Sequence, residues 1–150
     1  MSNIVRISQN TAIMMERARR FGVTDEMLLN VVQSGELTPL KVAEEEHYSY
    51  DDFLSYAEEN GEPLEQAIRE GYKITFNTNN GLKIWLFERF GVEAGRDFTP
   101  SEGRVDQLRL STSNVEALKS ALAANWVVIE HEQSGEEQVI SVVIRALAAQ

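Results

Sequence analysis

The spacing of apolar residues changes near Gly71, and this change constrains the fold more than any other feature of the chain. Before Gly71, apolar residues recur three or four positions apart and glycines close each stretch, which is typical of short helices. From Tyr72, and again near Leu108, apolar and polar residues alternate as in strands. The sequence therefore predicts an α+β fold, with a helical part at 1–71 packed on a small α+β part at 72–150.

Caps and glycines place four helices in the first part. They are expected to run from a cap at Asn10 or Thr11 to Phe21, from Thr24 to Gly35, from Ser49 to Gly61 and from Pro63 to Gly71. The stretch from Glu36 to Tyr50 has no clear period. It is predicted to be a loop with a short hairpin or a helical turn.

The second part is predicted to follow the order β-α-β-α-β-β. Its expected elements are a strand at 72–76, a helix from Asn77–Asn80 to Gly91, a strand around Leu108 and Leu110, a helix capped by Ser113, and a hairpin of 126–132 with 138–147. Val92 to Arg104 is predicted to be a polar loop. In the first of these helices Ile84 and Phe87 widen an already apolar arc, so the helix is either central or covered by a partner.

Charge and composition restrict the classes of partner. The net charge is −10, from 14 basic and 24 acidic residues, and the chain contains no cysteine. Without cysteine, disulfides, thiol catalysis and zinc sites of the cysteine type are excluded. No apolar run approaches the ~20 residues that span a bilayer, and the start of the chain lacks a signal-peptide pattern. We therefore expect a cytoplasmic protein with no membrane partner.

The run RARRFGVTDEMLLNVVQSGELTP followed by HYSYDDFLSYAEEN resembles the winged helix-turn-helix domains of the excisionase and MerR type. The resemblance covers about a third of the chain, and its implied DNA-reading helix, Asp25–Gln33, contains no Lys or Arg. It implies a sequence-specific DNA-binding regulator as an alternative function. The residues that would contact bases or phosphates are Arg17, Arg19, Arg20, Asn30, Gln33 and Lys41.

The segment Glu44–Glu70 holds ten carboxylates and one basic residue, Arg69. Such a field repels nucleic acid and attracts basic surfaces, and it can also mimic the phosphates of DNA. The leading hypothesis is therefore a regulatory or inhibitory binding protein of the bacterial or phage type, with a basic macromolecular partner. Its candidate contact residues are Glu44, Glu45, Glu46, Asp51 and Asp52. The simpler alternative is an acidic face that only keeps the protein soluble.

Catalytic patterns are sparse. The two histidines, His47 and His131, are 84 residues apart and have no metal-ligand spacing, so no metal or cofactor is expected. His47 lies near Asp51 and Asp52, which could orient its imidazole, and a small enzyme with a site near His47 is the second alternative. Asn79-Asn80-Gly81 opens a helix after a strand and could hold an anion on free N–H groups.

Overall fold

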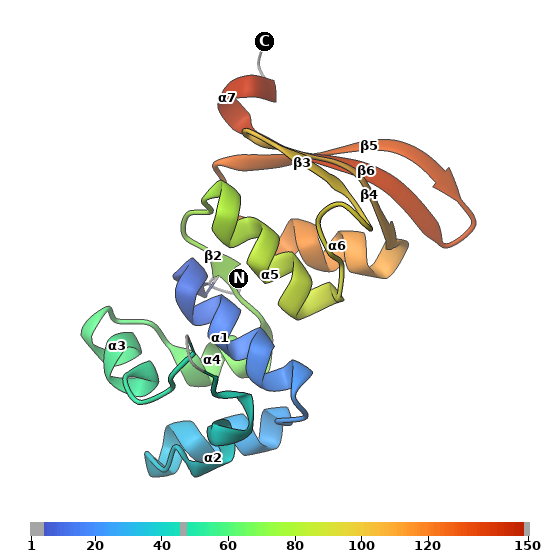
Figure 1. Cartoon of the computed structure of the whole chain (residues 1–150). Helices are drawn as coiled ribbons and strands as arrows, with labels where there is room; N and C mark the ends of the chain where they lie inside the picture. The colour runs from blue at the N-terminus through green and yellow to red at the C-terminus, as the bar shows by residue number, and fades with distance from the viewer. Residues whose placement is uncertain (1–4, 46–47, 149–150) are drawn as a thin grey trace.

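The helices precede an antiparallel sheet, and the fold is α+β as the sequence predicts (Figure 1). The computed structural model describes residues 5–45 and 48–148. Elements of the first part are β1 (Arg6–Ile7), α1 (Gln9–Arg20), α2 (Asp25–Ser34), the 3-10 helix η1 (Thr38–Ala43), α3 (Phe53–Glu59) and α4 (Leu64–Glu70). They are followed by β2 (Lys73–Ile74), α5 (Asn79–Phe90), β3 (Thr99–Ser101), β4 (Arg104–Ser111), α6 (Thr112–Ala121), β5 (Trp126–Ser134), β6 (Glu137–Ile144) and α7 (Arg145–Ala148).

Local capping chemistry sets the first helices. The hydroxyl of Thr24 accepts a hydrogen bond from the Met27 amide at 3.2 Å, and Gly35 closes α2 in the left-handed conformation with φ 76°, both as predicted. The predicted cap of α1 at Asn10 or Thr11 is wrong. Ser8 caps this helix instead and accepts from the Thr11 amide at 3.2 Å.

The stretch before α3 also differs in detail from the prediction. It contains η1 and a single antiparallel bridge between Glu45 and Tyr48, so it combines a helical turn with the start of a hairpin. Ser49 does not cap α3. Its hydroxyl instead accepts a hydrogen bond from the backbone amide of Asp51, two residues on, at 3.2 Å. This local hydrogen bond holds a turn that precedes the helix, which begins only at Phe53.

The sheet has the order β3-β4-β6-β5 and is antiparallel throughout. The predicted hairpin is confirmed as β5 and β6, which are joined by a tight turn between Ser134 and Glu137. Two predictions are wrong: β3 lies inside the predicted polar loop, and the first strand is only Lys73–Ile74. Instead of joining the sheet, β2 pairs in parallel with β1, so a backbone ladder crosses the predicted boundary near Gly71.

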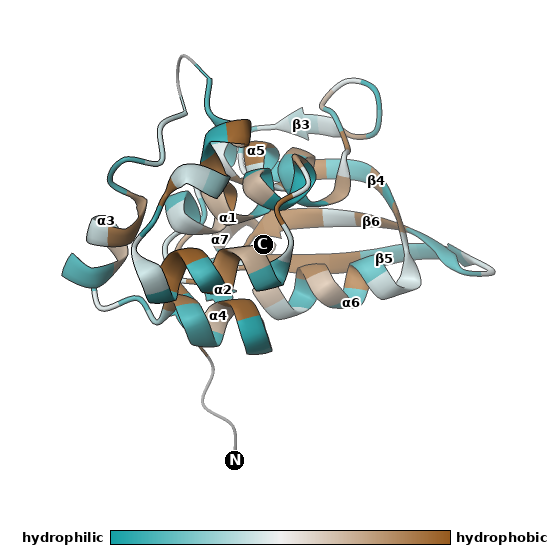
Figure 2. Ribbon diagram, turned by 90° about the horizontal axis from the view of Figure 1, so that it is seen from below, coloured by the Kyte–Doolittle hydropathy of each residue, from teal (hydrophilic) through white to brown (hydrophobic). Residues whose placement is uncertain are grey.

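Helix α5 occupies the centre of the molecule, between α1 and the sheet (Figure 1). Leu82, Trp85 and Leu86 are fully buried, and they belong to one apolar cluster that includes residues of both parts. Ile84 and Phe87 are partly buried, so the central position explains the wide apolar arc of this helix. Helices α5 and α6 lie against one face of the sheet, and α3 lies at the side of the molecule away from the β5–β6 turn (Figures 1 and 2).

Candidate functional site

The arginines of α1, which sequence analysis considered for phosphate contacts, take part in ion pairs within the protein. Arg17 is only 4% exposed. Its Nε donates to the Ala43 carbonyl at 2.7 Å and its Nη1 to the Glu88 carboxylate at 3.2 Å. Its Nη2 lies 3.1 Å from Glu45 Oε1 without hydrogen-bond geometry. Arg20 donates to the second oxygen of Glu88, so one buried carboxylate joins two arginines.

A second buried carboxylate, Glu16 of α1, also links α1 to α5. It accepts hydrogen bonds at 3.0 Å from both Arg19 and Arg89, and it also accepts from the Tyr72 hydroxyl. Burial raises the pKa of the Tyr72 phenol, and the Glu16 carboxylate raises it further. Burial alone would lower the pKa of Arg19, but Glu16 and Asp25 raise it. Both carboxylates are therefore paired, as buried charges must be.

The remaining candidates for DNA contact lie on or near α2. Asn30 and Gln33 are exposed, and the Gln33 amide donates to the Glu65 carboxylate of α4 at 3.3 Å. Lys41 is exposed and lies 3.5 Å from Glu44. Arg19 reaches Asp25 in the first turn of α2, about 12 Å along the helix axis from Gln33. Arg19 and Gln33 thus lie at opposite ends of this helix.

The predicted partner-binding carboxylates divide into two groups. Glu44 accepts from the Tyr50 amide at 2.8 Å and lies beside Lys41, and Glu45 is paired with Arg17. Asp51 and Asp52 are exposed, and none of the described cations lies within ion-pair distance of either. Glu46 lies outside the described residues. So does His47, the candidate for an enzymatic site.

Two further exposed carboxylates, Glu58 and Glu59, were not among the partner-binding residues predicted from the sequence. Both lie at the C-terminal end of α3, whereas Asp51 and Asp52 directly precede its first residue, Phe53. We call Asp51, Asp52, Glu58 and Glu59 the α3 acidic surface. Tyr56, on the same helix, is partly exposed beside them. The signal that could have revealed this surface is the seven-residue repeat of acid pairs around a short amphipathic helix.

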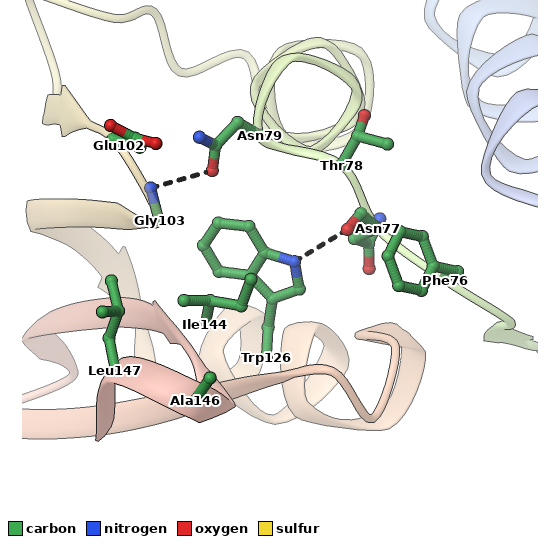
Figure 3. Close-up of a pocket in the computed structure, with 10 residues that line it drawn as sticks. All are labelled: Phe76, Asn77, Thr78, Asn79, Glu102, Gly103, Trp126, Ile144, Ala146 and Leu147. Carbon is green, nitrogen blue, oxygen red and sulfur yellow. Dashed lines mark hydrogen bonds between the residues drawn. The ribbon is translucent and has the colours of Figure 1, made fainter. Parts of the chain in front are cut away.

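A pocket of about 560 Å³ opens where α5, the sheet and α7 meet (Figure 3). Its lining comes from the entry to α5, the β3–β4 turn, β5, and the end of β6 with α7: Phe76, Asn77, Thr78, Asn79, Glu102, Gly103, Trp126, Ile144, Ala146 and Leu147. The volume falls within the range of small-molecule sites, about 300–1,000 Å³. The pocket could not be predicted from the sequence, because its walls come from four segments that are distant along the chain.

Asn77 holds the wall of this pocket together. Its carbonyl accepts from the Trp126 indole at 2.9 Å and from the Asn125 amide at 2.9 Å. Its side chain donates to Gln9 at 2.8 Å and accepts from the Ala123 amide at 3.0 Å. The sequence offers Asn77–Asn80 as caps of α5, and within this range Thr78 is the cap and accepts from the Gly81 amide at 3.1 Å.

The rim of the pocket exposes apolar and polar groups to solvent. Phe76 was predicted to point inward from a strand, but it is 59% exposed because the strand ends at Ile74. The side-chain oxygen Oδ1 of Asn79 accepts from the Gly103 backbone amide at 3.1 Å, which fixes the Asn79 side-chain amide at the rim. Gly103 has φ 71°, and a Cβ there would stand 2.6 Å from Leu147 Cδ1, so only glycine allows this close approach.

The sheet carries a polar cluster in which Ser141 lies between Asp106 and His131. The Ser141 hydroxyl donates to Asp106 Oδ1 at 2.6 Å, and His131 Nε2 lies 2.8 Å from Ser141 Oγ. Arg104 donates to both oxygens of Asp106 at 3.1 Å, and these hydrogen bonds, with that of Ser141, lower the pKa of Asp106. Because the serine proton is directed to the aspartate, this order differs from a nucleophile activated by histidine.

The described residues contain no group of three or more side chains placed to hold a metal ion, and none of their helices is long and apolar enough to cross a bilayer. Comparisons with protein-family models, with curated proteins and with solved structures found no match to this chain.

Proposed function

We propose that this protein is a non-catalytic regulatory or inhibitory protein of the cytoplasm that binds a macromolecular partner through the α3 acidic surface. The partner presents a basic surface. The observation that carries the proposal is the uneven use of charge: the α1 arginines are paired with carboxylates of the protein, whereas Asp51, Asp52, Glu58 and Glu59 face solvent without a cation among the described residues. The exposed charge of this region is therefore strongly negative.

This arrangement favours a basic partner over DNA. A duplex needs lysine or arginine side chains free to neutralise phosphates, and a protein that cannot supply them loses most of its affinity. A basic protein is attracted instead, since complementary charge steers the encounter and raises the association rate. The partly exposed Tyr56 supplies an aromatic contact of the kind that is enriched at protein interfaces.

The test compares two variants that each remove three negative charges. The first, Asp51→Asn/Glu58→Gln/Glu59→Gln, alters the α3 acidic surface. The control, Glu132→Gln/Glu136→Gln/Glu137→Gln, alters exposed acids of the β5–β6 hairpin. Both are used, as tagged full-length chains, to capture proteins from a cell lysate beside the wild type.

We expect a basic protein that the wild type and the control capture equally and that the α3 variant loses. With the purified partner, the α3 variant should associate more slowly and with a weaker dependence on salt, because screened long-range attraction is the quantity removed. Equal capture by both variants would show that this surface does not bind the partner.

The enzymatic alternative is tested with His47→Gln in the same assay. A binding protein should keep its capture of the partner and its biological effect, since no chemistry depends on the imidazole. Loss of the effect with retained capture and unchanged unfolding would instead favour a site at His47.

A further inference from the structure

We propose that the pocket at the entry to α5 binds a small zwitterionic molecule with a flat apolar group, of which aromatic α-amino acids are the simplest. This ligand site is separate from the α3 acidic surface and does not depend on it. Three features of the pocket suit such a ligand: the apolar interior, the exposed rim, and the charges on either side of Asn79.

The interior is suited to a flat apolar group. Trp126, Ile144 and Leu147 line it, and Figure 3 shows the indole facing the cavity with its N–H turned to the Asn77 carbonyl. Trp126 is only 2% exposed and forms an inner wall of the pocket, and because that hydrogen bond satisfies the indole N–H, the contact that the ring offers a ligand is apolar. Aromatic rings gain an additional ~0.5–1.5 kcal/mol from such pairing beyond the burial of their area.

The rim holds two exposed large apolar side chains, Phe76 and Leu147. Exposed large apolar residues are uncommon in the described part of the chain, and here two of them flank one pocket. Their exposure has a cost in water that a bound apolar group would remove.

Charges of both signs lie beside the pocket. A smaller cavity of about 210 Å³ is lined by Asn79, Lys83, Glu102 and Arg104, among others, and it shares Asn79 and Glu102 with the larger pocket. Arg104 is paired with Asp106. Lys83 and Glu102 form no ion pair with any described residue, so both charges remain available to a ligand.

The geometry of α5 places the cation and the amide together. Asn79 and Lys83 are four residues apart and therefore share one side of the helix. A ligand carboxylate can accept from the Lys83 ammonium and the Asn79 amide, while a ligand ammonium can donate to Glu102. An anion alone would face Glu102, and a cation alone would face Lys83, so a head group with both charges fits best.

The experiment follows the two indole N–H signals in a proton–nitrogen NMR spectrum of the whole protein. L-phenylalanine is titrated beside two probes that each lack one charge of its head group, 2-phenylethylamine and 3-phenylpropionate. Trp85 serves as an internal control, because it is fully buried and its indole donates to Tyr72 at 2.9 Å. A Trp85→Phe spectrum assigns the two signals.

We expect L-phenylalanine to shift the Trp126 signal in a saturable way and to leave the Trp85 signal in place. Each single-charge probe should bind about tenfold more weakly, the loss expected for one hydrogen bond to a charged group. Phe76→Ala should weaken all three probes, whereas the distant control Glu132→Gln should change none of them.

Two variants assign the head-group contacts. Glu102→Gln should abolish the preference for L-phenylalanine over 3-phenylpropionate, and Lys83→Met should abolish its preference over 2-phenylethylamine. Equal affinity for all three probes in the wild type would overturn the zwitterion proposal. An unchanged Trp126 signal with every probe would overturn the ligand site itself.

Discussion

Asn125 pairs with the backbone of Asn77 through both ends of its amide: Nδ2 donates to the Asn77 carbonyl at 2.9 Å, and Oδ1 accepts from the Asn77 N–H at 3.1 Å. The Asn125 side chain thus satisfies both backbone hydrogen-bonding groups of Asn77, as a neighbouring strand would, at a point where β2 has already ended. It joins the entry of α5 to the start of β5, from which two walls of the pocket arise.

Removing this pair should destabilise the protein measurably. Asn125→Ala leaves the Asn77 N–H without its partner, and we expect a loss of about 1–3 kcal/mol in the free energy of unfolding. Urea denaturation measures the change. Asn114→Ala, at an exposed position of α6, is the control and should change stability by less than ~0.5 kcal/mol. Equal effects of the two variants would contradict this role of Asn125.

The buried carboxylate Glu88 should be more costly to neutralise than an exposed one. Glu88→Gln removes the charge that Arg17 and Arg20 share, and we expect a loss of about 3–5 kcal/mol, as for other broken buried pairs. Glu65→Gln alters the exposed pair with Arg69 and the exposed hydrogen bond from Gln33, and it should cost less than ~1 kcal/mol. Chemical denaturation of both variants decides whether burial sets the difference.

Trp85 is the largest of the fully buried side chains and stacks edge-on against Phe90, with ring centroids 5.6 Å apart. Trp85→Ala should cost about 3–5 kcal/mol through lost contacts and the cavity left behind. Trp85→Phe should cost less, because it keeps a ring in the core. Calorimetric unfolding tests the order, and a loss well below 1 kcal/mol for the alanine variant would contradict it.

The pKa of Asp106 lies below its ordinary value of 3.8, held there by hydrogen bonds from Arg104 and Ser141. A lowered pKa means that the folded state prefers the carboxylate, so this group stabilises the fold above pH 3.8 and loses its effect as the pH falls through the folded pKa. Arg104→Met should raise the pKa, measured by carbon NMR titration of the carboxyl. Arg96→Met, which alters the pair with Asp97, should leave it unchanged.

Duplex DNA should show no mobility shift near 0.15 M salt (about physiological), because the α1 arginines are occupied and α2 carries Asp25 and Glu26 in its first turn. Lys41 is an exposed cation among the residues that the resemblance implies for DNA contact. A shift that weakens steeply with added salt and disappears in Lys41→Glu would refute the prediction.

Residues with local roles were predictable from the sequence, and residues with long-range roles were not. Thr24 and Gly35 act within one turn of their own helix, so their pattern sufficed. Phe76 followed the alternation of a strand, yet β2 ends before it because its partner is β1, a segment 67 positions away. The order β3-β4-β6-β5 likewise depends on pairings between distant segments that alternation does not encode.

The candidate sites show the same division. The acid-rich segment was visible in the sequence, and Asp51 and Asp52 are exposed there. Arg17 was a candidate for phosphate contact, because nothing local indicated that Glu88, 71 positions away, lies against it. The pocket needs the tertiary structure, since Phe76, Glu102 and Trp126 meet only after α5 has packed on the sheet.

The parallel pair of β1 and β2 has a consequence for synthesis on the ribosome. The backbone amide of Lys73 donates to the Val5 carbonyl at 2.7 Å, and that of Thr75 donates to the Ile7 carbonyl at 2.9 Å. Both Ile7 and Ile74 are fully buried. The helices between them form a loop whose ends are joined by this pair and by hydrogen bonds of Gln9 with Asn77 and Thr78. A nascent chain can form α1 to α4 early, but the β1–β2 pair that closes their core cannot form until Thr75 has left the exit tunnel.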